Sequence, residues 1–64
     1  MTEIKTFWDN SSTWHETYQS VNDKVNKYAK NNNLFIEDVK YIEHGDVLIA
    51  NVLFTDIPNE LFLL

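Results

Sequence analysis

Residues 47–54, VLIANVLF, are apolar on both of their alternating faces. A run of this length, bounded by turn residues, is typical of the central strand of a sheet, which is covered on both sides. The chain has only one segment with a good helical pattern, and one helix covers only one side of a sheet. The other side must therefore be closed by the C-terminal residues, by a second copy or by a partner.

Residues 13–31 carry the pattern of an amphipathic helix. Apolar side chains recur there at spacings of three and four residues, namely at Trp14, Tyr18, Val21, Val25 and Tyr28. Thr13, followed three residues later by Glu16, forms a capping box that satisfies free amides at a helix start. Asparagines follow at 31–33, and Asn tolerates the left-handed conformation that ends many helices. We therefore expect one helix, from about residue 13 to about residue 31.

Strands are predicted at about residues 3–8, 36–43 and 47–55, where β-branched and aromatic side chains are frequent. His44-Gly45-Asp46 separates the last two strands and predicts a tight hairpin turn, because Gly supplies a positive φ. A crossover from the first strand to the second leaves room for the third strand between them, antiparallel to both. The chain is thus predicted to be a single α+β domain, residues 1–64, with β-α-β-β order and one helix on one face of a three-stranded sheet.

The two faces of the central strand carry different side chains. Leu48, Ala50, Val52 and Phe54 form one set, and Val47, Ile49, Asn51 and Leu53 form the other. The Leu48 set is favoured under the helix because small Ala50 allows close approach, although the opposite choice is only slightly worse. The remaining set then becomes an interaction surface.

Residues 58–64 form an apolar C-terminal arm, which either folds back over the open sheet or docks into a second subunit. The second alternative predicts a homodimer. Its interface would consist of Val47, Ile49, Leu53, Leu61 and Phe62.

The size and composition limit the class of protein. At 64 residues the chain is near the lower limit for a stable domain, where only about 60% of the unfolded surface is buried. It contains no Cys, so neither disulfides nor thiolate zinc sites are expected, and a reducing, cytoplasmic location fits best. No apolar run approaches the roughly 18 residues of a membrane span, and no signal peptide is recognisable.

The acidic residues are unevenly distributed. The chain has ten acidic residues against five lysines and no arginine, and the net charge of −5 arises entirely after residue 36. An acidic surface without arginine disfavours direct binding of nucleic acid and favours a partner with a basic surface. The residues predicted to bind this partner are Glu37, Glu43, Asp46 and Asp56. The alternative is that these carboxylates only keep a small apolar protein in solution.

No catalytic constellation is recognisable, so we expect no enzyme, no metal and no cofactor. Ser11 and Ser12 have neither elbow glycines nor a triad spacing around them, and helix capping explains them. Glu43, His44 and Asp46 surround a hairpin turn, where such residues are ordinary.

A second hypothesis places a small nucleotide at the helix start. Free amides after Ser12 and Thr13 would bind a phosphate, while Trp8, Trp14 or Tyr18 stacks on a base. Two such sites in a dimer would sequester a nucleotide signal. The commoner role of Trp8 and Trp14 is a hydrophobic clamp that ties the first strand to the helix.

The segments EIKTFWD at residues 3–9 and EDVKY at residues 37–41, with the hairpin that follows, resemble a family of about sixty-residue sporulation-associated proteins of Gram-positive spore formers and their phages. The resemblance implies a small β-α-β-β protein of a low-GC bacterium or its phage and brings no catalytic residue. By analogy with small acidic phage inhibitors, we expect a non-catalytic protein that binds and inhibits or modulates a larger host protein, such as a host-defence or nucleic-acid enzyme. A nucleotide sponge and a structural sporulation component are the alternatives.

Overall fold

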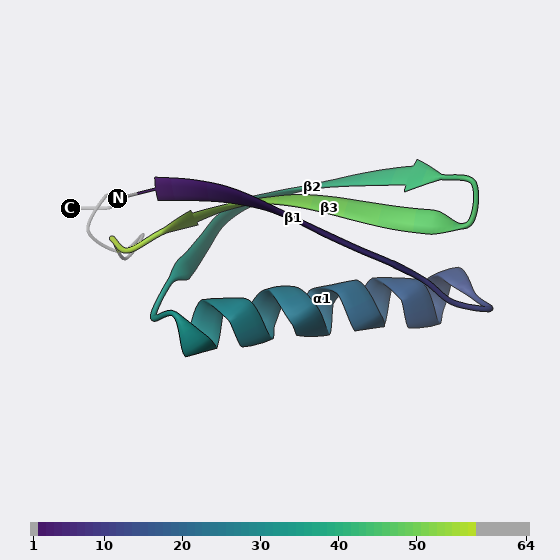
Figure 1. Ribbon diagram of the computed structural model, residues 1–64, viewed down its shortest axis with the longest axis horizontal. Helices are drawn as coiled ribbons and strands as arrows, with labels where there is room; N and C mark the ends of the chain where they lie inside the picture. The colour runs from purple at the N-terminus through teal and green to yellow at the C-terminus, as the bar shows by residue number, and fades with distance from the viewer. Residues whose placement is uncertain (1, 58–64) are drawn as a thin grey trace.

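Four regular elements make up the fold in the computed structural model, which describes residues 2–57 (Figure 1). They are β1 (Thr2–Asn10), α1 (Trp14–Asn31), β2 (Phe35–His44) and β3 (Val47–Thr55). The predicted α+β class is confirmed. β1 and β2 extend beyond their predicted ends at both termini, and α1 begins one residue after its capping Thr13. The predicted arm, residues 58–64 with Leu61 and Phe62, lies outside the described residues.

The sheet has the order β1-β3-β2, and both pairings with β3 are antiparallel, as the sequence predicts. Gly45 in the β2–β3 turn has a φ of 63°, a left-handed conformation that is costly for other residues. The register of β2 against β3 shifts between Ile36 and Asp38, so one extra residue bulges out of the ladder at Glu37.

The helix begins and ends with the residues that the sequence indicates. The Thr13 side-chain oxygen accepts a hydrogen bond from the Glu16 amide at 3.2 Å, which satisfies one free donor of the first turn. At the other end Asn33 adopts a φ of 54°, and the Leu34 amide donates to the Ala29 carbonyl at 2.8 Å. This left-handed residue closes the last turn and directs the chain into β2.

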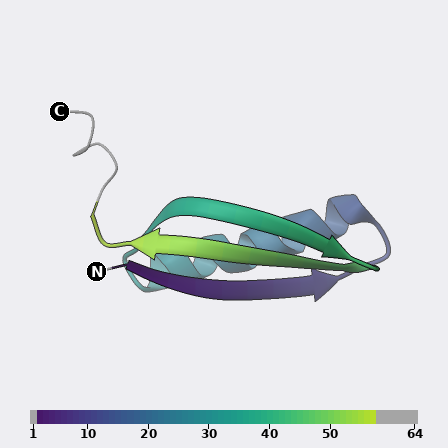
Figure 2. The same cartoon turned by 90° about the horizontal axis from the view of Figure 1, so that it is seen from above.

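The core lies between α1 and one face of the sheet, and Figure 2 shows the helix behind the three strands. The predicted Leu48 set faces the helix, since all four of its side chains are completely buried. Small Ala50 lies in the middle of this set, so the helix approaches the central strand closely. The buried apolar residues are Val21, Val25, Ala29, Leu48, Ala50, Val52 and Phe54.

The expectation that Trp8 ties the first strand to the helix is wrong. Trp8 pairs with Ile49 on the face away from the helix, and it is 58% exposed. Its neighbour Phe7 faces the helix instead and packs edge-to-face on Tyr28 and Phe54, with ring centroids 5.8 and 6.1 Å apart. Successive side chains of a strand point to opposite faces, so only one of the two aromatic residues can reach the helix.

Candidate protein-interaction surface

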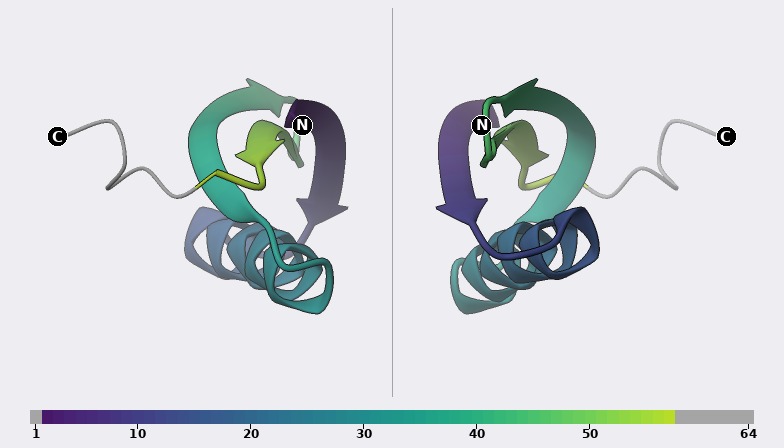
Figure 3. Two further views of the ribbon diagram at one scale, coloured as in Figure 1. Left: turned by 90° about the vertical axis from the view of Figure 1, so that its left-hand side faces the viewer. Right: turned by 90° about the vertical axis from the view of Figure 1, so that its right-hand side faces the viewer.

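The face of the sheet opposite α1 is covered by no other described element (Figure 3). We call it the open sheet face. Trp8, Ile49 and Ile42 lie side by side across its three strands and form an apolar row. Because directly paired residues have neighbouring side chains on one face, this row is a continuous apolar surface.

A second row of the open sheet face contains Ile4, Leu53 and Asp38, and Ile4 is 74% exposed. Between the two rows lies a polar one, in which the Thr6 hydroxyl donates to the Asn51 side-chain oxygen at 2.7 Å. This bond satisfies the Thr6 hydroxyl and the Asn51 side-chain oxygen within the sheet, and Lys40 of β2 completes the row beside Asn51. The Thr6–Asn51 hydrogen bond therefore needs no water or partner, and burial of the face requires only that the long Lys40 side chain, on an edge strand, keep its ammonium in solvent.

The predicted interface residues Val47, Ile49 and Leu53 are brought together on this face, and each is half-buried. Sequence reasoning missed exposed apolar members that come from the two edge strands, among them Ile4, Trp8 and Ile42. The alternation of residues 3–8 placed Ile4 and Trp8 on one side of their strand. It did not indicate which side the helix would cover.

The four predicted acidic residues are not brought together. Glu43 and Asp46 lie at the hairpin end of the sheet, whereas Glu37 and Asp56 lie near the opposite end, where β2 begins and β3 ends. Glu43 faces the helix side and accepts a hydrogen bond from the Tyr18 hydroxyl at 2.7 Å. This bond, with some desolvation, raises the pKa of Tyr18 above its usual range.

The predicted nucleotide site is only partly assembled. Ser12, Thr13 and Trp14 line a hollow of about 150 Å³ that the hairpin residue Asp46 also lines. The Asp46 carboxylate opposes a phosphate there, and the Glu16 amide is already bonded to Thr13.

The aromatic members of that predicted site lie apart from one another. Trp8 is on the other face of the sheet. Tyr18 packs against Trp14, with ring centroids 6.3 Å apart.

Within residues 2–57, no group of three or more His, Asp or Glu side chains is placed to hold a metal ion. Across the same part of the chain, no helix has the length and apolar character needed to cross a membrane. Comparisons of the sequence with protein-family models and with curated proteins, and of the structure with solved structures, find no match. The resemblance to sporulation-associated proteins therefore stays a prediction.

Proposed function

We propose that the protein is a non-catalytic interaction protein that forms a homodimer through its open sheet face and, as a dimer, binds and modulates a larger protein. The exposure of the apolar residues on this face carries the proposal. Ile4, Trp8 and Ile42 are 74%, 58% and 41% exposed, and they surround the half-buried side chains of β3. An exposed apolar row such as that of Trp8, Ile49 and Ile42 marks a protein-binding site.

The extent of the open sheet face supports a second copy as its occupant. Three strands about 4.8 Å apart and about eight residues long cover roughly 400 Å² of plane per copy. The accessible surface is larger than this plane because side chains project from it. Two such faces would therefore bury on the order of 1,000 Å², near the lower limit for a specific interface. Two sheets packed face to face also resemble the two layers of a β-sandwich.

Self-association would also stabilise a domain of this small size. A chain of 64 residues buries a small core, and proteins of this size commonly gain stability from oligomerisation. The open sheet face is apolar enough to supply that gain. The segment 58–64 is the alternative cover for this face, and a monomeric protein would support it.

The first experiment is the solution mass of the full chain, by light scattering after gel filtration over a dilution series. A dimer that dissociates on introduction of Asp at position 42 supports the proposal. Ile42→Asp is preferable to Ile49→Asp because Ile42 lies exposed on an edge strand, so the charge does not disturb the fold. A mass equal to one chain at all concentrations contradicts the dimer.

The proposed partner is a larger host protein with a basic surface, for example an enzyme of nucleic acids or host defence. The net charge of −5 and the acidic hairpin end, with Glu43 and Asp46, support this choice. The test passes a host lysate over the immobilised protein and over its E43K/D46K variant. A host protein that the original chain retains, that salt elutes and that the variant does not retain would support the proposal. Equal retention by both would contradict it.

A further inference from the structure

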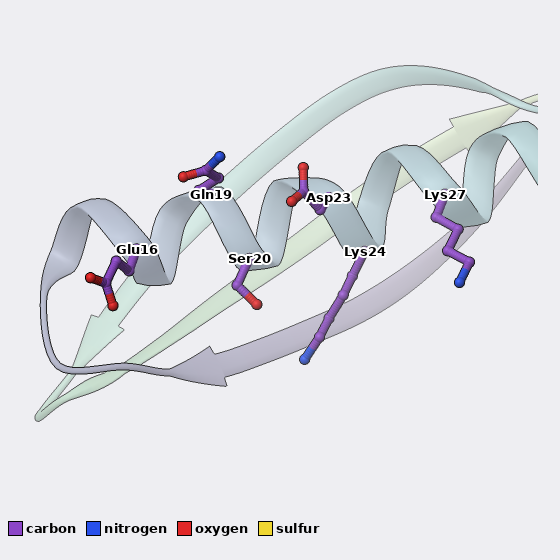
Figure 4. A pocket seen from close by; sticks show the side chains of 6 residues that line it. All are labelled: Glu16, Gln19, Ser20, Asp23, Lys24 and Lys27. Carbon is purple, nitrogen blue, oxygen red and sulfur yellow. The ribbon is translucent and has the colours of Figure 1, made fainter.

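The outer edge of β1 lies beside no other strand within residues 2–57, because the sheet has the order β1-β3-β2. The strand begins far from α1 and approaches the helix only toward its end (Figure 1). Near that end Lys24 reaches across from the helix and donates to the Trp8 carbonyl at 3.1 Å (Figure 4). The first half of the strand, residues 2–6, lies away from the helix and presents backbone donors and acceptors to a further strand. We call it the β1 edge segment.

The backbone of the β1 edge segment is suited to strand pairing. Proteins commonly protect their sheet edges with prolines or bulges. β1 contains no proline, and it pairs with β3 in regular register from Thr2 to Asn10. The other edge strand, β2, has the bulge at Glu37, which interrupts its ladder. Of the two edges, β1 is therefore the better one for the addition of a strand.

The sequence of the β1 edge segment, TEIKT, is complementary to itself in the antiparallel direction. When two copies pair about Ile4, each Glu3 lies opposite a Lys5 of the other copy. Each Thr2 likewise lies opposite a Thr6, and the two Ile4 side chains lie opposite each other. Opposite charges and β-branched side chains in directly opposed positions stabilise a pair of strands. Moving the centre by one residue toward either end would instead oppose two glutamates or two lysines, so charge specifies this register.

The charged side chains of the segment are available for this pairing. Glu3 and Lys5 lie on the helix side, where the Tyr28 hydroxyl donates to one Glu3 oxygen at 2.7 Å and the Lys5 ammonium lies 4.9 Å from the Tyr28 ring centroid. Within residues 2–57, neither of them forms an ion pair with a charged side chain. Glu3 keeps its second carboxylate oxygen as an acceptor, and Lys5 keeps its ammonium donors. A second copy can therefore supply the opposite charge to each.

We propose that two copies of the chain pair antiparallel through the β1 edge segment, about a two-fold axis at Ile4. The three-stranded sheet then continues as one sheet of six strands. Ile4, which is 74% exposed, becomes covered on one side by Ile4 of the other copy. The pairing does not depend on the proposed function, because it uses the strand edge and charges on the helix side rather than the open sheet face. A chain that uses both interfaces forms an assembly larger than a dimer.

The test reverses the two charges singly and together, with association measured by sedimentation equilibrium and folding by circular dichroism. Glu3→Lys and Lys5→Glu each replace two attractions by two repulsions, so each should weaken the edge pairing by at least roughly tenfold. The double variant E3K/K5E restores both attractions and should associate within about threefold of the original chain. An equimolar mixture of the two single variants should form a mixed assembly at concentrations where neither associates through the edge alone.

Lys30→Glu is the matched control for Lys5→Glu, because it makes the same charge change at an exposed position of α1. We expect it to alter association by less than about twofold. Equal losses in Lys30→Glu and Lys5→Glu would overturn the proposal, as would a mixture that associates no better than its components. An assembly that survives Glu3→Lys but dissociates on Ile42→Asp would show that the open sheet face alone holds the copies together, and would overturn the edge pairing only.

Cross-linking tests the register directly. The chain has no cysteine, so Ile4→Cys introduces a single thiol, and two such thiols would oppose each other at the proposed axis. In the same register the two Thr6→Cys thiols would lie four positions apart along the strands, roughly 13 Å, which is beyond the reach of a disulfide. We expect glutathione disulfide to link Ile4→Cys into a covalent dimer at least roughly tenfold faster than Thr6→Cys. Equal rates at the two positions would contradict the register.

Discussion

The substitution Trp8→Thr removes the largest exposed side chain of the open sheet face. A Trp side chain buries on the order of 250 Å² in total, so an exposed fraction of 58% leaves roughly 140 Å² for an interface. At about 25 cal/mol per Å², this area contributes at most ~3.5 kcal/mol per copy, or ~7 kcal/mol per dimer. With half of that area covered by the second copy, the loss is ~3.5 kcal/mol per dimer. The dissociation constant should then rise by about 300-fold.

The assay is sedimentation equilibrium over a dilution series, with circular dichroism of each sample to show that the chain remains folded. Trp14→Thr is the matched control, because Trp14 is 40% exposed but lies at the start of α1, away from the open sheet face. Ile4→Thr is a second test that disturbs the monomer less, since Ile4 is 74% exposed. If Trp8→Thr and Trp14→Thr shift the monomer–dimer equilibrium equally, the open sheet face is not the interface.

Four further outcomes are expected. Phe54→Ala should cost about 3–5 kcal/mol in urea denaturation, enough to unfold so small a domain, because Phe54 is completely buried. Gly45→Ala should cost about 1–2 kcal/mol by the same method, because the φ of 63° is strained for Ala while an added methyl meets no atom within 4 Å. Hydrogen bonds from Ser20 and the Asn10 amide lower the pKa of Asp9 below its ordinary value of 3.8. The stability this adds is present above pH 3.8 and is lost as the pH falls through the lowered pKa, so Asp9→Asn should flatten acid denaturation in that range. In a thermal-shift panel, a nucleotide at a hundred times its dissociation constant would stabilise the fold by about 2.7 kcal/mol, and we expect no such shift because Asp46 lines the hollow at the helix start.

The features that the sequence predicts correctly depend on interactions between residues that are close together in the chain. The spacing of Tyr18, Val21 and Val25 defines a helical stripe wherever the helix packs, and the Thr13 cap acts within a single turn. Both features were predicted and are present. The position of β3 between β1 and β2 follows from its apolar composition, and small Ala50 indicated which of its faces lies under the helix.

The face occupied by each edge-strand residue was decided by tertiary structure. Alternation separates Phe7 from Trp8 but does not show which of them faces the helix, because either could pack there. Only the register with β3 places Trp8 beside Ile49 on the open sheet face. The acidic residues form no single patch for a simpler reason, since Glu37 and Glu43 lie near opposite ends of the same strand.

The bulge at Glu37 shows most clearly that pairing between strands decides which face a side chain occupies. Ile36 and Val39 both lie on the helix side, opposite Phe54 and Val52, although they are three positions apart, a spacing that regular alternation places on opposite faces. Without the extra residue, Ile42 would share the helix side with Ile36, and the open sheet face would lose one member of its apolar row. The residues around Glu37 carry no turn signal, so alternation alone could not place Ile42. The sequence by itself determined the elements and their order. The hydrogen-bond register across three strands determined which side chains form a surface, because register is a relation between segments that are distant in the chain.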